Sequence, residues 1–291
     1  MQTWLTFRRG VQDRTSRVEP DEKTTWRPPR QPLYKNIFEP GPRSVPSFRV
    51  DRFDSLRRVQ DAPLGQSDRP TVTLRVPPAG CEPDRRARLD TIVRLCDVAL
   101  WDLDVPMEPA PGAVWVVRRT VLEVQRWPVA AETLSVSTWA SAAGRVWAER
   151  RIDLTGQCGA GVRLATLWAS VDPISGRPTR LSGLPGVADP RRRVPIGLTH
   201  LEPPDGSTSH LWPIRRSDID VLNHVNNSVI WTAWEDTECG AVASVGAGGR
   251  FETEYRSQLF HGPCELTRSP DGTQVWLGVP GERPAVSVRS V

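Results

Sequence analysis

One succession of elements, a strand, a helix and then several strands, is expected twice along this chain of 291 residues. In the first half, apolar residues recur at helical spacing and predict a largely buried helix over residues 89–103. Alternating apolar and polar residues predict the strands, as is typical of an antiparallel sheet with one buried face. These strands are expected at residues 71–77, before the helix, and at 114–124, 133–142, 145–155 and 162–172, after it.

The second half repeats this order with a strand at residues 211–216 and a helix at 226–245. Four further strands are expected at residues 250–259, 264–269, 274–279 and 285–291. Between the halves, residues 183–210 are rich in Pro, Gly and Arg, which is typical of a linker. A unit that occurs twice in one chain predicts an α+β protein built from two similar units, residues 71–182 and 211–291.

Composition and charge exclude several classes of protein. Hydrophobic residues make up 38% of the chain and charged residues 25%, which is the balance of a folded soluble protein. No apolar run approaches the roughly 18 residues that span a bilayer, and the N-terminus lacks the apolar centre of a signal peptide, so a cytoplasmic protein without membrane contact is expected. Residues 1–70 show no sustained period and are expected to form a largely irregular extension. They contain 14 lysines and arginines against 9 acidic residues, whereas the rest is nearly neutral, so no basic face for nucleic acid is predicted.

The cysteines and short motifs give no sign of a metal or an organic cofactor. The five cysteines are widely spaced and form no Cys-x-x-Cys pair, which indicates neither a disulfide framework nor a zinc site. No glycine-rich phosphate loop, metal-ligand cluster or Gly-x-Ser-x-Gly elbow is present. We therefore expect chemistry that uses side chains alone.

The densest group of chemistry-bearing residues directly precedes the second helix. Within eight residues it contains a carboxylate, an imidazole and two neighbouring amides, at Asp220, His224, Asn226 and Asn227. The first N–H groups of a helix are unpaired and carry the positive end of its dipole, so such a turn can polarise a carbonyl group. The approach to the first helix, residues 83–89, contains neither histidine nor asparagine, so one active site per chain is expected.

The succession Asp-x-x-x-His-Val-Asn-Asn at residues 220–227 resembles the signature of the hotdog-fold thioesterases. With the preceding Arg-x-Ser-Asp-Ile it is most similar to the acyl-carrier-protein (acyl-ACP) thioesterases, and Arg-Arg-Thr at 118–120 and the stretch at 171–178 extend the resemblance into the first half. The resemblance implies two tandem hotdog units, each a long helix wrapped by an antiparallel sheet. It also implies hydrolysis of fatty acyl-ACP to free fatty acid, without metal or cofactor, with acyl carrier protein as the partner.

Asp220 and His224 match the aspartate and the histidine of the family motif. With a pKa near neutrality, an imidazole can pass a proton between water and the leaving thiolate, while the aspartate orients it or aligns the water. A purely structural alternative is that Asp220 caps the turn and His224 is its hydrogen-bond partner. The placement of the whole motif directly before an apolar helix favours catalysis.

The sequence departs from the family pattern at two places. Plant-type members carry an asparagine two residues after the aspartate, where this chain has Leu222, with Asn223 one place later. Gln258 stands where the family has an acidic residue, and it can hold a catalytic water molecule but cannot accept its proton. The resemblance assigns Asn223, Asn226 and Asn227 to the substrate site, although helix capping is a sufficient reason for one of the last two.

Other functions stay open at this point. Acyl-CoA shares the reacting thioester with acyl-ACP and differs beyond the pantetheine, so an acyl-CoA thioesterase is the nearest alternative. A hydratase of the same fold is disfavoured because no second group of His and Asp is found. The changes at residues 222 and 258 also fit a non-catalytic protein that binds acyl chains or a carrier protein. Pairing of two chains into a homodimer is left open.

An acidic carrier protein predicts arginines near the entrance of the site, because complementary charge speeds and orients the encounter. The candidates are Arg215 and Arg216, directly before the motif, and the three linker arginines at 191–193. Because residues 211–216 are expected to form a strand, Arg215 and Arg216 face opposite ways and only one of them points to the entrance.

Overall fold

The structure is a computed structural model that describes residues 69–103, 109–181, 193–237 and 248–291. Most of the expected N-terminal extension, part of the linker and the second half of the predicted helix at 226–245 lie outside these residues. Within the described ranges, no helix is long and apolar enough to cross a membrane.

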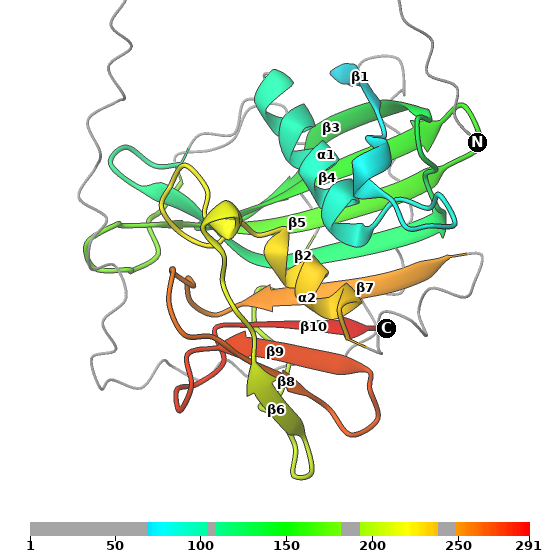
Figure 1. The fold of residues 1–291 in the computed structure, drawn as a ribbon. Coiled ribbons are helices and arrows are strands. Elements are labelled where there is room, and N and C mark those ends of the chain that lie inside the picture. Colours follow the sequence, from blue (N-terminus) through cyan, green and yellow to red (C-terminus); the bar gives the residue numbers. More distant parts are fainter. Residues whose placement is uncertain (1–68, 104–108, 182–192, 238–247) are drawn as a thin grey trace, which may run out of the picture. The chain divides into compact units, whose positions relative to one another are not determined.

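One antiparallel sheet of ten strands is the main element of the described residues (Figure 1). The strands are β1 (Thr71–Arg75), β2 (Val114–Arg126), β3 (Thr133–Ala143), β4 (Trp147–Gly156), β5 (Gly161–Val171), β6 (Thr208–Leu211), β7 (Gly249–Tyr255), β8 (Glu265–Arg268), β9 (Gln274–Gly278) and β10 (Val286–Ser290). Their order in the sheet is β1-β3-β4-β5-β2-β7-β10-β9-β8-β6, so each half of the chain contributes contiguous strands. The halves join where β2 pairs with β7, from Arg119 opposite Glu254 to Val124 opposite Gly249.

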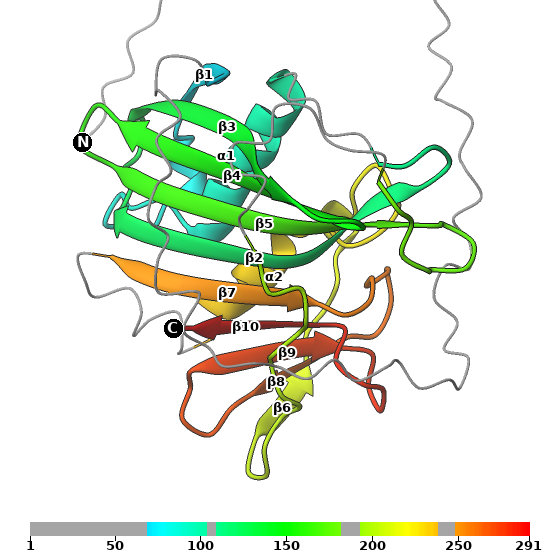
Figure 2. The same ribbon diagram turned by 180° about the vertical axis from the view of Figure 1, so that it is seen from behind.

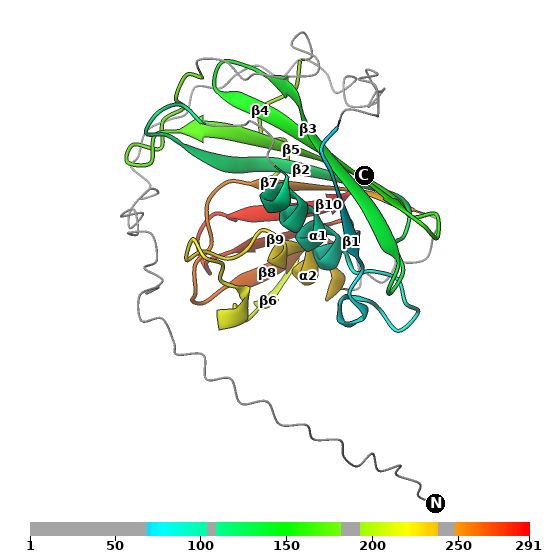
Figure 3. The same ribbon diagram turned by 90° about the horizontal axis from the view of Figure 1, so that it is seen from above.

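Two helices, α1 (Leu89–Asp102) and α2 (Val229–Glu235), pack against each other on one face of this sheet (Figures 1 and 3). The rings of Trp231 and Trp234 of α2 meet that of Phe251 of β7 edge to face, with centroids 6.4 and 6.2 Å apart. These three side chains are fully buried and form the centre of the core in the second half. The expected first helix is confirmed, and the second begins at Val229, three residues later than expected.

The strand expected at residues 211–216 is wrong. Strand β6 ends one residue into this range, and Arg216–Asp218 form the 3₁₀ helix η4. Trp212 and Ile214 are buried and alternate with exposed neighbours, but Pro213 between them has no N–H group to donate to a ladder. The apolar alternation therefore reflects burial here and not strand pairing.

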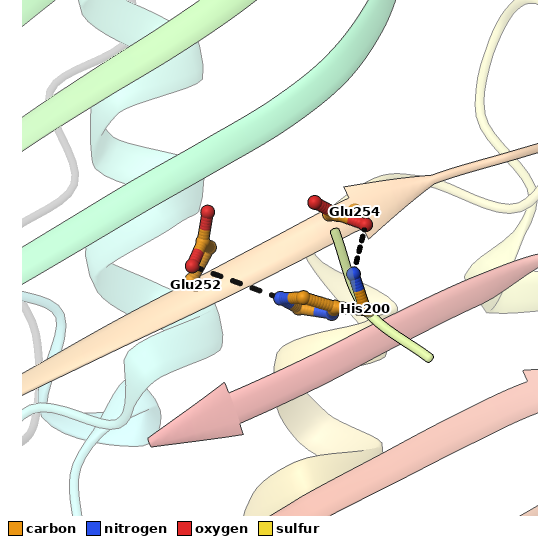
Figure 4. Close-up of side chains that lie close together, drawn as sticks. All are labelled: His200, Glu252 and Glu254. Atoms are coloured by element: carbon orange, nitrogen blue, oxygen red, sulfur yellow. Dashed lines mark hydrogen bonds and ion pairs between the residues drawn. The ribbon is translucent and has the colours of Figure 1, made fainter. Parts of the chain in front are cut away.

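A buried ion-pair network lies on the opposite face of the sheet, beneath the described part of the linker (Figures 2 and 4). Successive strand residues point to opposite faces, so Glu252 and Glu254 of β7 point away from the helices that Phe251 contacts. Arg119 of β2 reaches both carboxylates, with one N···O distance of 3.0 Å to each. The backbone N–H of His200, in the linker, donates to Glu254 at 2.8 Å.

The same network continues into β10 and ties the linker to three strands. The His200 Nδ1 lies 2.6 Å from the Ser287 hydroxyl, and Arg289 lies 2.7 Å from Glu252. Ligand-type atoms of His200, Glu252 and Glu254 also come within 4.8 Å of one another, a spacing that a metal ion can use. Because two guanidinium groups already balance the two carboxylates, we interpret this cluster as a structural salt-bridge network and not as a metal site.

The network predicts a loss of stability in acid. Burial by itself would raise the pKa of Glu252, but His200, Arg119 and Arg289 outweigh burial and lower the pKa from 4.5 to about 2. The folded state therefore binds this proton less readily than the unfolded state, so the stabilisation is complete above pH 4.5 and is lost as the pH falls toward 2. Urea unfolding of wild type and Glu252→Gln between pH 3 and pH 7 measures this. We expect the free energy of unfolding of the variant to depend less on pH than that of wild type. An equal dependence on pH in both proteins would contradict the assignment.

Candidate active site

Backbone hydrogen bonds close the turn that carries the Asp220 to His224 segment. The Asp220 N–H donates to the His224 carbonyl at 2.9 Å, and the Asn223 N–H donates to the Asp220 carbonyl at 3.0 Å. A side-chain oxygen of Asp220 accepts the N–H of Leu222 at 2.8 Å. Asn223 has a φ of 62°, in the left-handed region that asparagine tolerates better than most residues. The asparagine shifted to position 223 therefore has a conformational reason, and its side chain is exposed.

Asp220 and His224 face each other in this turn. The His224 Nδ1 lies 3.3 Å from the Asp220 carboxylate and 3.0 Å from the carbonyl oxygen of Val225. Both neighbours of Nδ1 are acceptors, so a proton held on Nδ1 leaves Nε2 free to exchange protons with water or a substrate. The two side chains are only partly buried, which leaves them within reach of a ligand.

Asn226 shapes the chain before α2 but does not occupy the expected cap position. Its side-chain oxygen accepts the N–H of Ser228 at 2.8 Å, and its own N–H donates to the Asp218 carbonyl at 2.8 Å. Ser228 holds the N-cap position without a side-chain capping bond. The Asn227 carbonyl accepts the Tyr255 hydroxyl at 3.4 Å, which links the start of α2 to β7. The assignment of Asn223, Asn226 and Asn227 to substrate binding stays a prediction.

The loop after β7 lies beside the Asp220 to His224 turn. The Val225 N–H donates to the Leu259 carbonyl at 2.8 Å, which joins the two segments next to His224. Gln258 directly precedes Leu259 and is partly buried. The structure therefore places the backbone of Gln258 close to this turn, and the assigned role of its side chain stays a prediction.

Two titratable side chains that the sequence prediction omitted, Asp97 of α1 and Tyr255 of β7, are linked to Asp220 by electrostatic interactions. The negative charge of Asp97 helps to raise the pKa of Tyr255, and the negative charge of Asp220 helps to raise the pKa of Asp97. Burial raises the pKa of Asp97 to about 6, with Arg94 opposing this shift and Asp220 adding to it. Burial likewise raises the pKa of Tyr255, so the phenol is neutral at physiological pH.

The start of α1 is filled by a side chain from α2. Glu235 accepts the N–H of Leu89, the first residue of α1, at 2.7 Å. Burial raises the pKa of Glu235 to about 8, and the hydrogen bond from Leu89 opposes this shift. A carboxyl group thus already occupies this helix start, which agrees with the expectation of one active site per chain.

Residues 108–182 match the family model described as the acyl-ACP thioesterase N-terminal domain. The resemblance to the acyl-ACP thioesterases is confirmed. The matched range contains β2, β3, β4 and β5, and the Asp220 to His224 turn lies outside it. The roles of the turn residues therefore depend on their geometry and on the motif, and not on this match.

Sequence relatives of this acyl-ACP thioesterase-like chain align over part of their length. The uncharacterized protein Rv2001 of Mycobacterium tuberculosis is 27% identical over 152 residues, which cover 51% of this chain and 60% of that protein. Acyl-[acyl-carrier-protein] hydrolase FATB3 of Cuphea viscosissima is 28% identical over 137 residues, which cover 42% of this chain and 32% of that protein. The chain thus spans less than two thirds of the length of these relatives.

Solved thioesterase structures are similar over most of their length. An acyl-ACP thioesterase from Bacteroides thetaiotaomicron has a TM-score of 0.61 and 18% identity, covering 76% of this chain and 96% of that chain. The 12:0-ACP thioesterase from Umbellularia californica has a TM-score of 0.58 and 18% identity, covering 76% of this chain and 92% of that one. At this level of identity the likeness shows the fold, which is that of these thioesterases.

Proposed function

We propose that this chain hydrolyses the thioester of fatty acyl-ACP and releases free fatty acid and the carrier. The observation that carries this proposal is the Asp220 and His224 pair, held 3.3 Å apart in a closed turn. The thioesterase fold supports it. The similar proteins are named as enzymes that act on acyl-ACP, and their substrate class is the one that the motif predicts.

Hydrolysis of a thioester needs two proton transfers. One proton leaves the water whose oxygen attacks the carbonyl carbon, and one proton joins the thiolate that departs as the C–S bond breaks. The free Nε2 of His224 can serve in these transfers, while Asp220 orients the ring and stabilises the imidazolium form. The bond from the Val225 N–H to the carbonyl of Leu259, the residue after Gln258, supports a role for the Gln258 amide in holding this water.

The tandem arrangement is part of the same proposal. We infer that residues 71–182 and 211–291 are two hotdog units joined by the linker at 183–210. In each half one strand precedes the helix and four strands follow it. The strand order β1-β3-β4-β5-β2 of the first half corresponds position by position to β6-β8-β9-β10-β7 of the second. Such an identical order supports a duplicated unit.

Steady-state hydrolysis by the purified full-length chain tests the function. Acyl-ACPs of graded chain length and the matching acyl-CoAs are supplied, and thiol release is measured. We expect turnover with acyl-ACP and a maximum at one chain length. Faster turnover of acyl-CoA would move the assignment to that substrate. Binding of acyl-ACP without any turnover would contradict the enzyme and favour an acyl-chain or carrier-binding protein.

The turn also presents a candidate docking surface for the carrier. Val221, Leu222 and Phe260 are 91%, 61% and 54% exposed, so they offer apolar surface to a partner. Arg215 and Arg216 are also exposed, and they precede this turn directly. The expectation that they face opposite ways on a strand is wrong, because Arg216 begins η4 and Arg215 is its N-cap. We call these five residues the docking surface.

The docking surface predicts a salt effect that depends on the carrier. We expect kcat/KM for acyl-ACP to fall steeply with added salt, because the Debye length shortens from about 10 Å at 0.1 M to about 3 Å at 1 M. A short acyl-pantetheine lacks the acidic protein, so its hydrolysis should hardly respond. In the double variant Arg215→Ala/Arg216→Ala, the salt effect on acyl-ACP should shrink. Equal salt sensitivity of both substrates would contradict docking. Of the other candidates, Arg191 and Arg192 lie outside the described residues, and Arg193 is exposed.

A further inference from the structure

The proposed hydrolysis needs the His224 ring in a fixed position, and two acceptors, the Asp220 carboxylate and the Val225 carbonyl, lie beside its Nδ1. We propose that Tyr255 of β7 is a positioning residue for this ring, because its hydroxyl holds the segment to which the Val225 carbonyl belongs. This inference rests on the proposed function and adds to it a group from the sheet. Tyr255 acts through the backbone and takes no part in the two proton transfers.

The ring of Tyr255 is anchored in the core, and its hydroxyl reaches the start of α2. Glu254 is bound by Arg119 on the face of the sheet away from the helices, so the next residue of β7 points toward the helices. On that face the Tyr255 ring packs against the hydrophobic core. Its hydroxyl donates to the Asn227 carbonyl at 3.4 Å. A phenol joins a rigid apolar body to one polar atom, so the packed ring can hold a backbone carbonyl in place.

The peptide unit between Asn227 and Ser228 is bound at both ends. Its carbonyl accepts the Tyr255 hydroxyl, and its N–H donates to the side-chain oxygen of Asn226 at 2.8 Å. The N–H of Asn226 donates in turn to the Asp218 carbonyl at 2.8 Å. These last two bonds stay within one short stretch of the chain, whereas the bond from Tyr255 ties that stretch to β7. Because a peptide unit is planar, losing the bond at its carbonyl end lets the whole unit rotate.

The same segment carries the acceptor of the His224 proton. The Val225 carbonyl lies 3.0 Å from the His224 Nδ1, and the Val225 N–H donates to the Leu259 carbonyl at 2.8 Å, in the loop after β7. Strand β7 and this loop therefore hold the segment at two points, one on either side of Asn226. With the Tyr255 hydroxyl removed, only the bond at Leu259 remains, and the Val225 carbonyl is free to turn relative to the ring.

The phenol can perform this role at any working pH. Burial raises the pKa of Tyr255, and the negative charge of Asp97 adds to this shift, while hydrogen bonding with Thr253 opposes it. The hydroxyl therefore keeps its proton and stays a donor to the Asn227 carbonyl. A positioning residue of this kind predicts a loss of activity that is the same at each pH, whereas an acid or a base would make the loss depend on pH.

The other end of α2 offers a matched control for a purely structural role. The hydroxyl of Thr237, two residues beyond this helix, donates to the Trp234 carbonyl at 2.6 Å. Tyr255→Phe and Thr237→Val each remove one hydroxyl from one backbone carbonyl and keep most of the shape of the side chain. If the bond from Tyr255 only stabilised the fold around α2, the two variants would act alike on turnover.

Steady-state kinetics of the full-length variants test the proposal. We expect Tyr255→Phe to lower kcat for acyl-ACP roughly tenfold, less than loss of the imidazole, because the ring remains but loses its alignment. KM should stay unchanged, and the loss should be the same between about pH 6 and pH 9. Thr237→Val should keep the kcat of wild type. Equal kcat in the two variants would overturn the assignment, and so would a loss confined to KM or a loss that varies with pH.

The His224 ring provides a second measurement that needs no turnover. In ¹⁵N NMR the neutral imidazole of wild type should carry its proton on Nδ1, where both acceptors lie, and His224→Ala assigns the signal among the four histidines. Tyr255→Phe should shift this proton toward Nε2, and Thr237→Val should not. An unchanged tautomer in Tyr255→Phe would overturn positioning even if the chain is a thioesterase. If wild type hydrolyses no acyl thioester, the proposed function fails, and the tautomer still decides whether Tyr255 positions His224.

Discussion

Replacing His224 or Asp220 with alanine is expected to lower kcat for acyl-ACP by about 10²-fold or more, the usual range for a positioned acid–base group. The two side chains face each other at 3.3 Å, so loss of Asp220 leaves the imidazole without its orienting partner. Loss of His224 removes the ring that exchanges the proton. Steady-state kinetics with acyl-ACP measure both effects, and circular dichroism checks that the fold is kept.

Two further variants sharpen this expectation. Gln258→Ala should lower kcat less than either substitution, because an amide can position water but cannot take its proton. His210→Ala is the matched control. This histidine is exposed on β6, so its replacement should leave kcat unchanged. Unchanged turnover in both motif variants would show that Asp220 and His224 are structural, whatever the fold of the chain.

Removing Arg119 is expected to destabilise the fold by about 3–5 kcal/mol, the usual cost of breaking a buried ion pair from one side. Arg119 is 4% exposed and stands between Glu252 and Glu254, so Arg119→Ala leaves two buried carboxylates without their shared cation. Its guanidinium also donates to the Pro195 carbonyl at 3.1 Å, so the linker loses an anchor to the sheet. Urea unfolding at pH 7 gives the change in free energy.

The same pair of strands provides the control for this experiment. Arg250 of β7 and Glu123 of β2 form an ion pair at 3.6 Å whose side chains are 25% and 30% exposed. Arg250→Ala should cost no more than about 1 kcal/mol, because solvent screens this pair. In a double-mutant cycle, Arg119→Ala with Glu254→Gln should cost less than the sum of the single changes. Equal costs for Arg119→Ala and Arg250→Ala would show that the network contributes no more than a surface pair.

Much of the secondary structure could be predicted from local patterns. Helix α1 and nine of the ten described strands fall within or close to the expected ranges, because burial of one face imposes a period of 3.6 or 2 on neighbouring residues. The exception is the range 211–216, where β6 ends at Leu211. Apart from one bond from the Trp212 N–H to the Cys264 carbonyl, the alternation comes from Trp212 and Ile214 packing inward. Periodicity indicates which side of a segment is buried. Whether the segment pairs as a strand depends on hydrogen bonds to a partner strand far along the chain.

The candidate site was only half accessible to sequence reasoning. Asp220 and His224 are four residues apart, so a single turn brings them together and the motif alone predicts their pairing. Tyr255, whose hydroxyl donates to the Asn227 carbonyl, comes from strand β7 after α2. No local pattern connects Tyr255 with the turn, because the contact results from tertiary packing.

By itself, the sequence determined the α1 stripe, the alternating strands, the duplicated order and the Asp220 to His224 turn, since each depends on residues that are close along the chain. Only the tertiary structure decided that β2 and β7 join the halves into one sheet, that Arg119 neutralises Glu252 and Glu254, and that the Tyr255 hydroxyl meets the Asn227 carbonyl. The physical reason is that these contacts link residues far apart in sequence. Their charges and hydrogen bonds gain strength only when packing brings them together and excludes water.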